Sequence, residues 1–132
     1  ALILGSLSSE NALSARLERE WSIDTRMDCY AVPRGSANFW FLIAGQSAPK
    51  MLAKLCAVDL RPHKFPVTSI AQTSVARSVA IIIRINLGAT PAFYLLGDSA
   101  SALYMFDCLE DAMGEFVGKP VGISAVRWVM EA

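Results

Sequence analysis

The sequence has few charged side chains and no surplus of either sign. Charged residues make up 18% of the chain, below the ~25% usual in soluble domains, and 12 Lys and Arg balance 12 Asp and Glu. Nucleic acids and anionic membranes attract proteins with a basic surplus, so we expect neither as a partner. Apolar residues reach 54%, too many for a small domain to hide alone, which indicates a buried interface with another protein.

Long apolar runs and paired cysteines are also missing. The runs FWFLIAG and VAIIIRI are far shorter than the ~20 residues that span a bilayer. The first residues, ALILGSLSSEN, lack the basic stretch and longer apolar core of a signal peptide. Cys29, Cys56 and Cys108 are odd in number and scattered, which is typical of free thiols in a reducing compartment. We therefore expect a cytoplasmic protein.

No catalytic, metal-binding or nucleotide-binding motif is complete. Ser47 and Lys50 have the S-x-x-K spacing, but its companion motifs are missing and Ser47 is expected to cap a helix. His63 is the only histidine, and the cysteines lack the close pairs of a structural zinc site. No glycine-rich phosphate loop is present. We predict that this chain has no catalytic residues and itself binds no metal and no cofactor.

Apolar periodicity and helix-breaking residues predict the order of the elements. The two prolines of RPHKFP forbid a helix there, so this stretch is expected to be an extended connection. The last helix is expected to turn Ala102, Phe106, Leu109, Met113 and Phe116 inward. In chain order, we predict a helix over 8–21 capped by Ser8 or Ser9, a strand over 38–44, a helix after Ser47, strands over 67–75, 78–86 and 92–97, and a helix over 99–116.

This order predicts an α+β fold. The sheet is expected to be mostly antiparallel with helices packed on one face, in a ferredoxin-like sandwich. We expect one domain over 1–132, with an N-terminal helix and arm over 1–36, a core over 37–118 and a C-terminal tail over 119–132.

Three predicted strands are apolar on nearly both faces, as is usual where both faces of a sheet are covered. The predicted helices suffice for one face. The other is covered either by the N-terminal helix and the C-terminal tail, or by a permanent partner, which we favour. The residues selected as the partner interface are Trp40, Leu42, Ile82, Tyr94 and Leu96.

The stretch GQSAPKMLAKLCAVDLRPHKFPVTSIAQTSVARSVAIIIRI resembles the gamma subunit of heterotetrameric sarcosine oxidase. The likeness continues through AFYLLGDSASALYMFDCLEDA and covers residues 38–116. The family usually has glycine after Phe-Pro, whereas positions 67 and 68 here are valine and threonine. The matching residues are Leu52, Leu55, Cys56, Asp59, Leu60, Pro62, Phe65, Pro66, Gln72 and Thr73.

The resemblance implies an abbreviated relative of the folate-binding aminomethyltransferase fold, in a subunit without cofactor or catalytic residues. It implies alpha, beta and delta subunits as partners, which together bind FAD, FMN, NAD, tetrahydrofolate and zinc. Such a complex oxidatively demethylates sarcosine to glycine, with hydrogen peroxide and a formaldehyde or methylenetetrahydrofolate unit as further products. The signature residues expected to be structural are Cys56, Asp59, Leu60, Pro62, Phe65, Pro66 and Thr73.

Three other interpretations stay open at this point. The chain is a candidate subunit of a related N-methylglutamate or other secondary-amine dehydrogenase. A stand-alone module that binds folate is the second. The third is a domain that associates with a copy of itself, since a symmetric interface would need the same apolar surplus.

Overall fold

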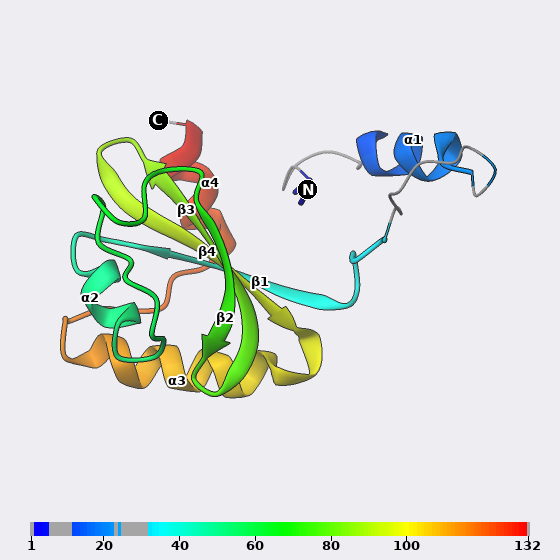
Figure 1. Ribbon diagram of the computed structural model, residues 1–132. Helices are drawn as coiled ribbons and strands as arrows, with labels where there is room; N and C mark the ends of the chain where they lie inside the picture. Colours follow the sequence, from blue (N-terminus) through cyan, green and yellow to red (C-terminus); the bar gives the residue numbers. More distant parts are fainter. Residues whose placement is uncertain (1, 6–11, 23, 25–31, 132) are drawn as a thin grey trace. The chain divides into compact units, whose positions relative to one another are not determined.

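The computed structural model describes residues 2–5, 12–22, 24 and 32–131, and divides the chain into two compact units, Ala1–Gly35 and Ser36–Ala132. The second unit contains the sheet and most of the described helices, as Figure 1 shows. The expectation of one domain over the whole chain stays a prediction.

The first unit contains a short helix, α1 (Ala12–Glu20). The guanidinium Nε of Arg16 donates to Oε1 of Glu20 at 2.7 Å, one helical turn away. Leu13 and Leu17 are exposed, while Trp21 is half-buried. The predicted caps, Ser8 and Ser9, lie outside the described residues.

The second unit is built on a four-stranded antiparallel sheet with the strand order β1-β4-β3-β2. Its strands are β1 (Asn38–Ala44), β2 (Ile70–Val75), β3 (Ser78–Leu87) and β4 (Thr90–Asp98). Long runs of branched and aromatic residues favour these strands. The predicted α+β class with an antiparallel sheet is confirmed, and β2 begins later than expected.

The helices of the second unit lie on both sides of the sheet. Figure 1 shows α2 (Ala48–Leu52) and α3 (Ala102–Gly114) on one side and α4 (Ile123–Glu131) on the other. A short 3₁₀ turn, η2 (Ser99–Ser101), precedes α3. The stretch 119–132, expected as a tail without assigned structure, therefore contains a helix.

Helix α2 is short and ends at Leu52. Ser47 occupies the N-cap position, but its side chain makes no capping hydrogen bond, and Pro49 stands in the first turn. After Leu52 the chain tightens into turns, and Cys56 forms an isolated bridge with Val75 at the end of β2. This bridge ties the chain after α2 to an edge of the sheet.

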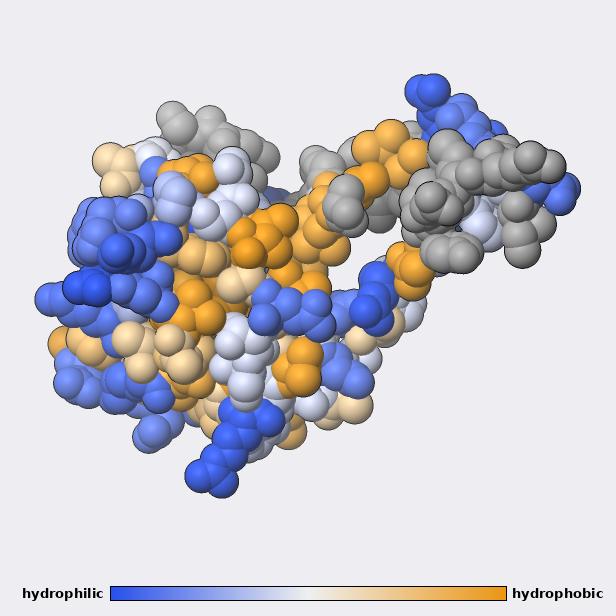
Figure 2. Space-filling model, in the orientation of Figure 1, coloured by the Kyte–Doolittle hydropathy of each residue, from blue (hydrophilic) through white to orange (hydrophobic). Residues whose placement is uncertain are grey.

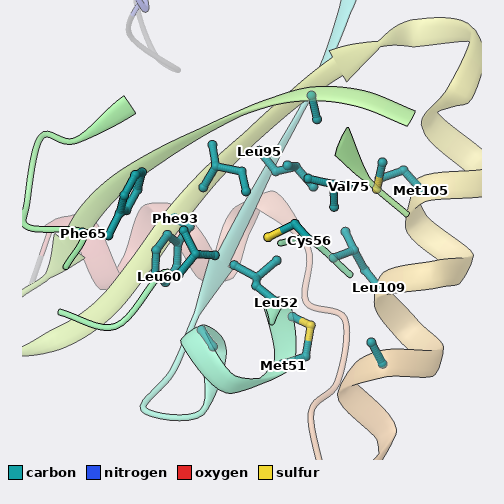
Figure 3. Close-up of a cluster of buried hydrophobic side chains, with 14 of the residues drawn as sticks. Met51, Leu52, Cys56, Leu60, Phe65, Val75, Phe93, Leu95, Met105 and Leu109 are labelled. Atoms are coloured by element: carbon teal, nitrogen blue, oxygen red, sulfur yellow. The ribbon is translucent and has the colours of Figure 1, made fainter. Parts of the chain in front are cut away.

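The core lies between the sheet and the pair α2 and α3, as Figure 3 shows. The strands, the two helices and the connection between Cys56 and β2 all contribute side chains to this core. The largest fully buried side chains are Phe93, Leu52, Leu60, Ile82, Leu95, Met105 and Val75.

The residues that α3 buries match the prediction only in part. Met105, Leu109 and Ala112 are buried, whereas Phe106 is exposed and meets Phe41 edge-on, with 6.2 Å between the ring centres. Leu109 belongs to both sets, and Ala102, Met113 and Phe116 pack partly buried against the core as predicted. The prediction was wrong about Phe106 and missed Met105 and Ala112.

Candidate functional site

The candidate site is the side of the sheet that faces away from α2 and α3, which we call the outer face. Side chains alternate along a strand, so the pairing of the strands assigns every residue to one side. The outer face consists of Trp40, Leu42 and Ala44 of β1, Ala92, Tyr94 and Leu96 of β4, Val79, Ile81, Ile83 and Ile85 of β3, and Ile70, Gln72 and Ser74 of β2.

Two aromatic side chains mark the centre of the outer face on β1 and β4. Trp40 lies opposite Leu96, and Leu42 lies opposite Tyr94. The rings of Trp40 and Tyr94 meet edge-on, with 5.0 Å between their centres. The tryptophan and the tyrosine are both half-buried, so a rigid aromatic pair is available to another surface.

The outer face is only partly covered. Ile83 and Leu96 are buried, but Trp40, Ile81 and Ile85 are half-buried, and toward the β2 edge Val79 is 69% exposed. Figure 2 shows apolar side chains gathered in the middle of the viewed side of the second unit, with hydrophilic ones around them.

Helix α4 lies on this side of the sheet, yet it leaves apolar side chains of its own in contact with water. Trp128 is 74% exposed, and Ile123 is exposed as well, whereas Val126 is half-buried. A helix that closed the outer face would bury its apolar residues against it. The outer face and the exposed apolar residues of α4 are therefore the candidate interaction surface.

The structure separates one selected interface residue from the other four. Trp40, Leu42, Tyr94 and Leu96 share the outer face, but Ile82 pairs with Leu95 on the opposite side and is fully buried in the core. The selection of Ile82 was wrong, because alternation defines two faces of a strand without matching them to the faces of its neighbour.

The residues of β3 that lie on the outer face are Ile81, Ile83 and Ile85, which sequence reasoning did not select. A signal for them was present, since a tight turn at GATP fixes which residues pair. The turn places Leu87 opposite Thr90, and counting back along both strands pairs Ile83 with Tyr94 and Ile81 with Leu96.

The signature residues lie around the core and not on the outer face. Cys56, Leu60 and Phe65 are buried, and Figure 3 shows Leu60 and Phe65 beside Phe93 at one end of the core. Thr73 is half-buried, on the core side of β2. Pro62 and Pro66 are exposed in the connection that leads to β2. The functional role of these residues stays a prediction.

Asp59 and Arg61 form an ion pair at the start of this connection. The Arg61 guanidinium donates to both carboxylate oxygens, from Nε to Oδ1 at 2.8 Å and from Nη2 to Oδ2 at 2.5 Å. The backbone N–H of Arg61 donates to Oδ1 as well, at 3.2 Å. These hydrogen bonds lower the pKa of the Asp59 carboxyl to about 2.

The described residues do not come together as a metal site. No group of three or more His, Cys, Asp and Glu side chains is placed to hold a metal ion within the described ranges. Burial raises the pKa of the Cys56 thiol, so this sulfur is held in its less reactive form. Cys29 lies outside the described residues. Among the described helices, none has both the length and the apolar character needed to cross a bilayer.

Comparison with known proteins finds similarity at the level of structure. No family model and no curated protein sequence matches the chain. Among solved structures it is similar to a chain of the heterotetrameric sarcosine oxidase from Corynebacterium sp. U-96 in complex with pyrrole 2-carboxylate, with a TM-score of 0.61 and 24% identity. The match covers 69% of this chain and 45% of that chain, so this chain spans less than half of the relative. The two proteins share a fold.

Proposed function

We propose that the chain is a non-catalytic subunit of a sarcosine-oxidase-type complex, corresponding to its gamma subunit. The observation that carries the proposal is the apolar outer face, which the helices of the second unit leave partly uncovered. Two further findings support it, the fold shared with a chain of a heterotetrameric sarcosine oxidase and the signature from Cys56 to Thr73.

In this proposal the chemistry belongs to the other subunits. Alpha, beta and delta subunits bind FAD, FMN, NAD, tetrahydrofolate and zinc, and the complex oxidises sarcosine to glycine in the cytoplasm. Hydrogen peroxide and a one-carbon unit, as formaldehyde or methylenetetrahydrofolate, are the other products. The chain itself contributes an apolar surface that holds the assembly together.

The energetics of the outer face favour a permanent partner over a transient one. Burial of apolar surface stabilises association by about 2.5 kcal/mol for each 100 Å² removed from water. Half-buried Trp40 and Tyr94 supply a rigid aromatic centre, and Val79 and Trp128 supply exposed apolar area beside it. Aromatic residues in the middle of an interface contribute most to its stability.

The proposal is tested by purifying the tagged full chain from its native host. We expect a yellow complex with a flavin absorbance spectrum that contains three further chains, and mass analysis identifies them. A colourless chain that elutes alone and stays soluble would contradict the proposal, and titration with folates would then be the next measurement.

Two leucine variants locate the interface in the same experiment. Leu42→Asn changes a half-buried residue of the outer face, whereas Leu103→Asn changes a residue of α3 that is 74% exposed. We expect Leu42→Asn to reduce the recovered partner chains by about tenfold and Leu103→Asn to leave them unchanged. Equal loss in both variants would place the interface elsewhere.

A further inference from the structure

Among the residues that the structure describes in the second unit, one charged side chain, that of Arg84, is buried. Arg84 lies on β3, on the core side of the sheet, and is 4% exposed. Its guanidinium carbon lies over the ring of Phe93, 4.9 Å from the ring centre. Phe93 itself packs with Leu60 and Phe65 at one end of the core, as Figure 3 shows. The positive charge is therefore surrounded mainly by apolar groups.

Most of the hydrogen-bond donors of Arg84 have no partner. Nη2 donates to Oδ1 of Asn86 at 3.0 Å. Nε and Nη1 are buried and make no hydrogen bond. An arginine keeps its charge at every physiological pH and has five N–H donors, three of them on these two nitrogens. Buried polar groups are normally paired, so a cation with three unpaired donors requires an explanation.

The described part of the chain offers no carboxylate to Arg84. Its three ion pairs are Arg16 with Glu20, Lys54 with Glu115, and Arg61 with Asp59. The aromatic ring of Phe93 attracts the cation but accepts none of its N–H groups as a carboxylate would. The charge and the donors of Arg84 thus match an anion that lies outside the described residues.

A second unusual feature lies next to Arg84. The backbone carbonyl of Arg84 accepts from the N–H of Thr68 at 2.9 Å, and its N–H donates to the carbonyl of Ser69 at 2.9 Å. Thr68 has a φ of 72°, a left-handed conformation that is an outlier for a β-branched residue. Strained backbone of this kind is concentrated at ligand sites and at segments that change conformation.

From these two features we infer that Arg84 binds a carboxylate group from another molecule, with the strained segment at Thr68 as the part of the chain that moves to admit it. Nη2 keeps one N–H beyond its bond to Asn86, and this N–H forms a planar pair with the free donor of either Nε or Nη1, which suits the two oxygens of a carboxylate. Two sources have this chemistry, a small carboxylate in solution and an aspartate or glutamate side chain of a partner subunit.

The first arm of the test follows the Nε–H resonance of Arg84 by NMR while sodium acetate is added to the full chain. Sodium chloride at equal ionic strength is the control for screening. We expect a saturable shift with acetate alone, and a rise in Tm of about 5 °C at ten times the Kd. Arg84→Met assigns the resonance and abolishes both responses, while Arg77→Met, at an exposed position, keeps them.

The second arm distinguishes the sources by adding the partner chains, if the purification described above recovers them; only this arm depends on the proposed function. A resonance that ignores acetate but shifts in the assembled complex identifies a partner side chain. A resonance that changes in neither arm overturns the inference. Pairing within the chain is recognised separately, because Arg84→Met would then lower the Tm of the full chain without any acetate response, whereas we expect it to leave the Tm unchanged or raise it.

Discussion

The two faces of the sheet have similar residues and different surroundings. On the core side Ile82, Phe93 and Leu95 are fully buried, whereas on the outer face Ile81 and Tyr94 are half-buried and Ile70 is 55% exposed. The same four strands supply both faces, and both are rich in branched and aromatic residues. Apolar composition therefore indicates that a face of the sheet must be buried against something. Whether this chain buries the face itself depends on which of its other elements pack against it.

The difference follows from how many elements reach each face. α2, α3 and the connection through Leu60 and Phe65 close the core side. Among the described elements, α4 is the helix on the side of the outer face (Figure 1), and its residues Ile123 and Trp128 are exposed. Exposed apolar surface of this kind marks a candidate interaction site, and it supports the partner proposed above.

The largest expected loss of stability is found by truncating two neighbouring isoleucines, Ile82 on the core side and Ile81 on the outer face, and comparing the results. Ile82→Ala opens a cavity in the core and is expected to lower the free energy of unfolding by about 2–5 kcal/mol. Ile81→Ala removes a half-buried side chain and is expected to cost about 1 kcal/mol in the isolated chain. Urea denaturation of the two variants measures both values.

In an assembled complex, Ile81→Ala is expected to have a larger effect than in the isolated chain. Ile81→Ala is then expected to weaken the association of the subunits, because its side chain becomes part of an interface. Equal destabilisation of the isolated chain by both substitutions would contradict the comparison, since it would mean that the outer face is already closed.

A glycine on the core side gives the second prediction. A Cβ at Gly97 would lie 2.6 Å from Cζ of Phe39 and 2.7 Å from its Cε1, so the ring must move. We expect Gly97→Ala to lower the free energy of unfolding by about 1–3 kcal/mol, through this crowding. Thermal unfolding measures the effect, and Gly114→Ala, where nothing lies within 4 Å, is the control.

Restoring space tests the cause. If the ring of Phe39 is responsible, Phe39→Leu combined with Gly97→Ala is less unstable than the sum of the single changes predicts. Strict additivity of the two substitutions would show that the close approach of Phe39 is not what requires glycine at this position.

Strands built from continuous apolar runs could be predicted from the sequence, and conformations set by neighbours could not. The bounds of β1 and β3 follow from NFWFLIA and SVAIIIRI almost to the residue. β2 was expected from residue 67, but it begins at Ile70 because Thr68 takes a left-handed conformation. α4 follows Gly118 and Pro120, and the pattern after them was too short to assign.

The candidate site was predictable as a kind of surface and only partly as a set of residues. An excess of apolar strand residues indicated an uncovered face, and four of the five selected residues lie on it. The error at Ile82 has a geometric cause, because the side shared by two strands depends on their register. The unpaired state of Arg84 was invisible in the sequence, since it depends on which groups the fold brings to it.

The third prediction concerns the connection that leads to β2, which lies over the core side of the sheet. Thr68 is exposed and has a left-handed φ of 72°, where glycine is free of the Cβ conflict. We expect Thr68→Gly to raise the free energy of unfolding by about 1 kcal/mol, measured by urea denaturation.

The matched control is Val67→Gly, one residue earlier, which is also exposed and has no positive φ. At an ordinary backbone conformation glycine destabilises, because it loses more conformational freedom on folding. A gain in Val67→Gly, or a loss in Thr68→Gly, would show that the left-handed conformation of Thr68 is not strained.

The smallest effect is expected at the exposed ion pair that begins the connection over the core side. Hydrogen bonds from Arg61 lower the pKa of the Asp59 carboxyl from 3.8 to about 2 in the folded chain. Because the folded pKa is below the unfolded one, the pair stabilises the fold above pH 3.8 and loses this contribution as the pH falls toward 2.

We expect Arg61→Gln to return the pKa of Asp59 toward its ordinary value, measured by NMR titration of the carboxyl carbon. Stability above pH 5 should change little, because exposed pairs contribute weakly and salt screens them. A large loss of stability at neutral pH in Arg61→Gln would mean that this connection, and with it the closure of the core side, depends on the ion pair more than on the burial of Leu60 and Phe65.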